Sequence, residues 1–109
     1  MSKREWKLFV EDILESIALI EKYVEGMDSK DFGKDRKTMD AVVRNLEIIG
    51  EAAKNIPDEI TRKYKKIDWK GVVGLRNRIA HEYFGISVEI VWNIITQELS
   101  KLKEQIQKI

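Results

Sequence analysis

Apolar residues recur along the chain at spacings of three and four, and this pattern predicts four long amphipathic helices. The first helix is expected from about residue 3 to residue 25, and the second from about Asp35 to Asn55. The apolar stripe of the first consists of Trp6, Phe9, Val10, Ile13, Leu14, Ile17, Ile20 and Val24. The stripe of the second consists of Met39, Val42, Val43, Leu46, Ile49 and Ala53.

Helix-ending and helix-capping residues set the expected boundaries. Gly26 ends the first helix, and residues 26–34 are expected to form a loop with a short turn around Asp31. Asp35 is a plausible N-cap of the second helix, and Pro57 stops that helix. A short extra helix is expected near residues 58–65.

The remaining two long helices follow from the same reasoning. Asp68 is expected to cap a third helix that begins at Trp69 and ends near Gly85. Ser87 is expected to cap a fourth helix over residues 88–107. Its apolar stripe consists of Val91, Ile94, Ile95, Leu99, Leu102 and Ile106.

Four such helices predict an all-α fold, an antiparallel up-and-down four-helix bundle that occupies residues 1–109 as a single domain. The length of 109 residues leaves no room for a second domain. Leu19, Tyr23 and Trp92 lie off the main stripes. This surplus of apolar surface favours a homodimer.

Composition narrows the classes of partner and compartment. Charged residues make up 36% of the chain, but the net charge is only +1, so any nucleic-acid binding must use a local patch. The absence of cysteine excludes disulfides and cysteine nucleophiles, and it fits a reducing cytoplasm. The charged N-terminal stretch does not resemble a signal peptide, and no membrane span is expected.

The stretch RNRIAHEYFG, residues 76–85, carries the densest candidate chemistry, including the only histidine. Arg76 offers a planar fork of donors for phosphate, His81 can transfer a proton near neutral pH, and Asn77 can bind a phosphate oxygen or hold the imidazole. On a helix, Asn77 and His81 share a face, while Arg76 and His81 lie about 140° apart. The alternative is structural: the histidine is a partner of the helix dipole and Tyr83 is a half-buried core aromatic.

Two other polar sets are candidates for supporting roles. Lys65, Lys66, Lys70 and Arg78 belong to a basic run that could follow an RNA backbone, although such runs are usually solvated loop faces. Glu47 and Glu51 are four residues apart on the second helix. Ion pairs with Arg44 or Arg76, in support of a site, are expected of them before direct catalysis or metal binding.

Residues 76–83, RNRIAHEY, resemble the R-x4-H-x-Y motif of the HEPN superfamily. The stretches RNLEIIGEAAKNIP and IDWKGVVGLRNRIAHEYFGI are similar to the second- and third-helix signatures of its HepT branch, the toxins of HepT/MntA toxin–antitoxin systems. The resemblance covers most of the chain from the second helix onwards.

The resemblance implies a metal-independent, cofactor-free endoribonuclease toxin that dimerises and places two copies of the motif in one cleft. His81 would then transfer a proton, Arg76 would stabilise the phosphorane, and Asn77 would orient or bind phosphate. The resemblance also implies that a minimal nucleotidyltransferase antitoxin, of the MNT type, transfers AMP onto Tyr83. The alternative is a non-catalytic HEPN subunit that binds nucleotide or nucleic acid, or that docks a nucleotidyltransferase.

Overall fold

The computed structural model describes residues 5–83 and 88–109, and the side chains of residues 80–83 fall outside that description. The described residues form helices and connecting turns and contain no strand. The elements are α1 (Trp6–Tyr23), α2 (Ser29–Lys34), α3 (Arg36–Lys54), α4 (Asp58–Lys63), α5 (Trp69–Val73), α6 (Leu75–Tyr83), α7 (Val88–Asn93), the π-helical segment η1 (Ile94–Glu98) and α8 (Leu99–Ile106). The predicted all-α class and the short helix near 58–65 are therefore confirmed.

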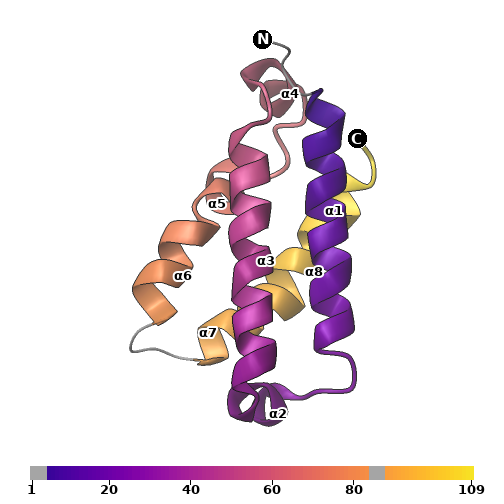
Figure 1. The fold of residues 1–109 in the computed structure, drawn as a ribbon. Coiled ribbons are helices and arrows are strands. Elements are labelled where there is room, and N and C mark those ends of the chain that lie inside the picture. The colour runs from indigo at the N-terminus through magenta and orange to yellow at the C-terminus, as the bar shows by residue number, and fades with distance from the viewer. Residues whose placement is uncertain (1–4, 84–87) are drawn as a thin grey trace.

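The long helices α1 and α3 run side by side in opposite directions, and the α7–η1–α8 helix crosses them obliquely (Figure 1). Helix α6 packs against α3. The interior is built from the predicted stripes: Ile13, Val42, Leu46 and Ile49 are all 0% exposed. Burial of each such side chain contributes roughly 1.5–3 kcal/mol relative to exposure, which explains why spacing alone located these helices.

The segment expected to be a loop, residues 26–34, contains the helix α2, and this expectation was wrong. Gly26, at φ +78°, turns the chain after α1. A capping box then starts α2, because the Asp28 side chain accepts from the Asp31 N–H and the Asp31 side chain accepts from the Asp28 N–H. Phe32, on this short helix, is 0% exposed, and its ring centre lies 5.3 Å from that of Trp92 of α7, with the two rings tilted by 39°.

The Phe32–Trp92 contact also changes one argument for a dimer. Trp92 is one of the three off-stripe residues whose apolar surface favours a homodimer in the prediction from sequence. The structure instead places it partly buried against Phe32 within the same chain. Tyr23, at 37% exposed, still presents apolar surface, as do Leu8 and Val73.

The predicted cap of the second long helix is present. The Asp35 carboxylate accepts from the backbone N–H of Thr38 at 3.0 Å and from its hydroxyl at 2.8 Å. These two hydrogen bonds hold the pKa of Asp35 below its ordinary value. Helix α3, which carries the candidate glutamates, therefore begins at a fixed residue.

The third predicted helix is broken in two at Gly74, and the fourth contains the π-helical turn Ile94–Glu98, so neither is the continuous α-helix that the sequence predicts. Asp68 does cap α5, since its carboxylate accepts from the Gly71 N–H at 3.1 Å. A Cβ atom at Gly50 of α3 would lie only 3.2 Å from the Val72 carbonyl oxygen and 3.6 Å from the Arg76 nitrogen. Gly50 therefore lets the α5–α6 junction lie against the backbone of α3.

Candidate functional site

A groove between α1, α3 and α6 brings together four of the residues that the sequence singled out. It has a volume of about 320 Å³. Its lining consists of Phe9, Arg44, Glu47, Ile48, Glu51, Ala52, Asn55 and Arg76. Arg44, Glu47 and Glu51 project from one face of α3, and Arg76 reaches the groove from the first turn of α6. The Gly50 contact places that first turn beside Glu51.

The ion pairs in this groove are long and exposed. Arg76 Nη1 lies 4.0 Å from Glu51 Oε2, and Arg44 Nη1 lies 3.9 Å from Glu47 Oε2. The two arginine side chains are 66% and 71% exposed, respectively. Such pairs contribute little to stability, because water screens them and they cost side-chain entropy. The pairing of these glutamates with Arg44 and Arg76 agrees with the expectation from sequence.

Arg76 is held loosely enough to bind an anion. Among the described side chains, those of residues 5–79 and 88–109, Glu51 is the ion-pair partner of its guanidinium, and the 4.0 Å separation is too long for a hydrogen bond. The donors of the planar fork are therefore available to a phosphate, and Glu51 restrains the direction in which the fork points.

The other arginine of the motif helix faces the opposite side. Arg78 is two residues from Arg76, about 200° around the helix. Its guanidinium makes a bidentate ion pair with Glu98 of η1, at 2.9 and 3.0 Å. This pair joins the motif helix to the last long helix. Arg78, expected to follow an RNA backbone, therefore has a carboxylate partner within the chain.

The remaining candidates are separated from the groove. Asn77 is exposed on α6 and does not line the groove. Lys65 and Lys66 lie between α4 and α5, and Lys70 lies on α5; all three are exposed. His81 and Tyr83 belong to α6, but their side chains fall outside the described part of the structure.

Sequence reasoning missed several groove residues and one partner. Phe9 belongs to the predicted apolar stripe of the first helix, and Ile48 belongs to none of the predicted stripes. An isoleucine off the stripe is nevertheless a signal of a second apolar surface. Asn55 lines the groove and donates to the Glu51 carbonyl at 2.9 Å. Glu98 could not be linked to Arg78 from sequence, because the two are 20 residues apart on different helices.

In the part of the chain that the structure describes, no three side chains of the His, Cys, Asp or Glu type gather closely enough to hold a metal ion. Among the same residues, no helix is long and apolar enough to cross a membrane.

Comparisons with known proteins identify relatives over the whole chain. The family described as "Ribonuclease HepT-like" matches residues 13–109. A "Probable ribonuclease HepT" of Thermococcus cleftensis is 40% identical over 107 residues, which cover 98% of this chain and 97% of the relative. A "Putative RNase" of Methanocaldococcus jannaschii is 40% identical over 109 residues, covering 100% of this chain and 90% of the relative. Another "Putative RNase", of Caldanaerobacter subterraneus, is 41% identical over 101 residues, covering 93% and 90%. No solved structure matches the chain.

Proposed function

The chain belongs to the Ribonuclease HepT-like family, and from that membership we propose that it is an endoribonuclease that cleaves RNA without a metal ion. The observation that carries the proposal is the position of Arg76. Its guanidinium lies in a groove with Arg44, and the Glu51 carboxylate, 4.0 Å away, restrains it. A cation placed in this way can stabilise the charge that develops on a phosphate during cleavage.

The proposed reaction is attack of the ribose 2′-hydroxyl on the adjacent phosphorus. The 2′ oxygen forms a bond to phosphorus, the bond to the 5′ oxygen breaks, and a 2′,3′-cyclic phosphate remains. His81 transfers a proton, Arg76 binds the non-bridging oxygens of the phosphorane, and Asn77 orients the imidazole or binds phosphate. Glu51, Glu47 and Arg44 support this set by restraining Arg76 and the groove wall.

A homodimer completes the proposed site. The mechanism benefits from both a base and an acid, and each chain contains one histidine. A second copy supplies the second imidazole when the two motif helices share a cleft. The exposed side chains of Leu8 and Val73 provide apolar surface for such an interface.

The experiment that tests the proposal is cleavage of single-stranded RNA by the purified protein in excess EDTA. We expect cleavage to persist in EDTA, and the 5′ fragments to carry 2′,3′-cyclic phosphate ends that mass spectrometry detects. Ends with a 3′-hydroxyl, or activity restored only by added Mg²⁺, would contradict the proposed chemistry. Tight binding of RNA or nucleotide in calorimetry, with no cleavage under any condition, would favour a non-catalytic binding subunit.

We further propose that the chain is the toxin of a toxin–antitoxin pair, in which a minimal nucleotidyltransferase modifies Tyr83. Transfer of AMP to the phenol would add bulk and negative charge two residues from His81, and this would occupy the anion site and repel RNA. After co-expression with such an enzyme, intact-mass measurement should show added AMP, and the Tyr83→Phe variant should show none. AMP found on another residue in the wild-type protein would contradict the assignment.

A further inference from the structure

A second pocket, with a different charge from the Arg76 groove, lies between residues 63–67, at and after the end of α4, and residues 101–108 of the C-terminal segment. It has a volume of about 520 Å³ and shares no lining residue with the Arg76 groove. Five of its lining residues are lysines, and they define what we call the lysine pocket: Lys63, Lys65, Lys66, Lys101 and Lys108. Glu104 is the one acidic residue of its lining.

The charge of the lysine pocket is concentrated and unneutralised. Five lysines against one glutamate give a net charge of +4, whereas the whole chain carries only +1. Among the side chains that the structure describes, those of residues 5–79 and 88–109, none of the five lysines has a carboxylate within ion-pair distance. Lys103, on the same helix as Lys101, does bond to Glu21, at 3.0 Å. Positive charges that line one pocket without carboxylate partners repel one another, and a polyanion relieves that repulsion.

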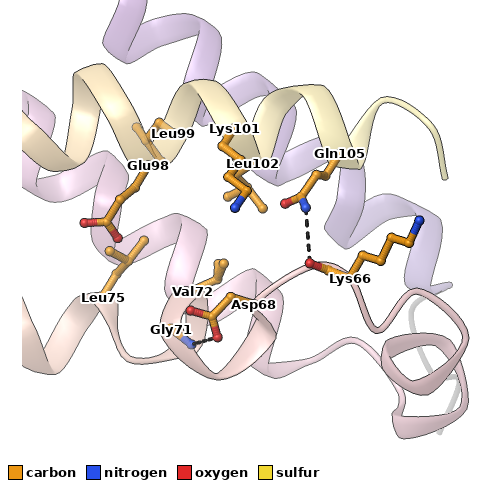
Figure 2. Close-up of a pocket in the computed structure, with 10 residues that line it drawn as sticks. All are labelled: Lys66, Asp68, Gly71, Val72, Leu75, Glu98, Leu99, Lys101, Leu102 and Gln105. Carbon is orange, nitrogen blue, oxygen red and sulfur yellow. Dashed lines mark hydrogen bonds between the residues drawn. The ribbon is translucent and has the colours of Figure 1, made fainter.

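The backbone that displays these lysines is held in place. The Lys66 carbonyl accepts from Gln105 Nε2 of α8 at 3.1 Å, and this bond joins the two walls of the pocket (Figure 2). The Tyr64 carbonyl accepts from Trp69 Nε1 at 3.1 Å, and Ile67 is buried beneath the same segment. The lysine side chains therefore extend from a fixed frame, which lowers the entropy cost of binding a ligand.

The pocket also offers an aromatic surface. Tyr64 is partly buried in the lining, and Lys63 Nζ lies 5.5 Å from the centre of its ring. Proteins that bind single-stranded nucleic acid combine backbone-following cations with aromatic rings on which bases stack. Free phosphate would need donors that converge on one point, whereas these cations are spread along two segments of chain.

A smaller pocket, of about 190 Å³, continues from the lysine pocket towards the start of α6. It shares Lys66, Lys101 and Gln105 with the lysine pocket and reaches Leu75, the first residue of α6 (Figure 2). Its acidic residues are Asp68 and Glu98. Asp68 caps α5, and Glu98 is neutralised by Arg78, so repulsion of a passing phosphate is reduced.

We propose that the lysine pocket is an exosite that binds backbone phosphates of single-stranded RNA outside the cleavage site, with Tyr64 as a stacking surface for a base. The inference rests on the proposed ribonuclease function, because it assigns the pocket to that enzyme's substrate. The longest dimension of the molecule is 42 Å, so a stacked strand of about a dozen nucleotides, at roughly 3.4 Å each, is long enough to connect the exosite and the Arg76 groove.

The test is RNA binding by a His81→Ala protein, which leaves the RNA uncut. The variant adds Lys63→Gln, Lys101→Gln and Lys108→Gln, which removes three of the five charges of the lysine pocket. The matched control adds Lys30→Gln, Lys34→Gln and Lys37→Gln, which remove the same charge from exposed positions around α2, at the opposite end of the molecule (Figure 1). Fluorescence anisotropy with labelled single-stranded RNA of about 20 nucleotides gives the affinity and its salt dependence.

We expect the pocket variant to bind this RNA at least about tenfold more weakly, and the slope of log K against log salt to shrink by about 2, at roughly 0.7 per lost phosphate contact. The control should bind like the parent. Equal binding by parent and pocket variant, or an equal loss in the control, overturns the exosite. Pocket-dependent binding of polyglutamate with no effect on RNA also overturns it, in favour of an acidic protein partner. Failure of the wild-type protein to cleave RNA overturns the proposed function alone, because this assay does not depend on cleavage.

Discussion

Replacement of His81 with alanine is expected to lower the rate constant for RNA cleavage by about 10²- to 10⁴-fold, the usual contribution of a positioned proton-transfer group. Arg76→Ala should lower this rate constant by about 10²- to 10³-fold, because the guanidinium donors that stabilise the negative charge of the phosphorane are lost. Arg76→Lys should recover only part of this loss, since an ammonium keeps the charge but not the planar fork. Single-turnover cleavage of a labelled RNA measures all three rate constants.

The matched control is Arg36→Ala. Like Arg76, Arg36 is an exposed arginine that pairs with a carboxylate, in its case that of Asp40. It lies at the start of α3 and does not line the Arg76 groove. Its replacement should leave the cleavage rate within about twofold, as for a surface change. Circular dichroism and thermal unfolding should show that all variants retain the helical fold. Wild-type rates in both His81→Ala and Arg76→Ala would remove the proposed site.

The parts of the fold that the sequence predicted correctly are those in which spacing and burial agree. The α1 and α3 stripes fill the interior because a three-and-four repeat places them on one side of each helix. The resemblance to HepT proteins is likewise confirmed at the level of the family. The R-x4-H-x-Y motif of that family is defined by residue types at fixed spacing, so it can be identified from the sequence alone.

The parts that the sequence could not supply depend on contacts between distant segments. No proline or change in charge marks the helix break at Gly74 in the sequence. The break lies where the α5–α6 junction packs against the backbone of α3 at Gly50. The ion pair of Arg78 depends on Glu98 of η1, which lies 20 residues further along the chain. Lys101 and Lys108 join the basic segment of residues 63–66 only after α8 folds back beside it.

The missed helix α2 carries the largest stability prediction. Phe32→Ala should lower the free energy of unfolding by about 3–5 kcal/mol, the usual cost of deleting a buried phenyl ring. The ring is 0% exposed, and its centre lies 5.3 Å from that of Trp92, so truncation leaves a cavity between α2 and α7. A helix of six residues cannot hold its place by backbone hydrogen bonds alone, so this ring is its main attachment. Urea unfolding followed by circular dichroism measures the change.

Two further variants make the Phe32 result interpretable. Phe32→Leu keeps most of the volume and should cost less than about 1.5 kcal/mol, so a graded loss remains measurable even where the alanine variant does not fold. Tyr23→Ala removes an aromatic side chain that is 37% exposed at the end of α1, and should cost far less than Phe32→Ala. A loss below about 1 kcal/mol for Phe32→Ala would mean that α2 is not anchored through this ring. We therefore expect Phe32→Ala to cause the largest loss of unfolding free energy among the three variants. The reason is that an aromatic ring stabilises the fold through the apolar surface it removes from water and the neighbours it contacts.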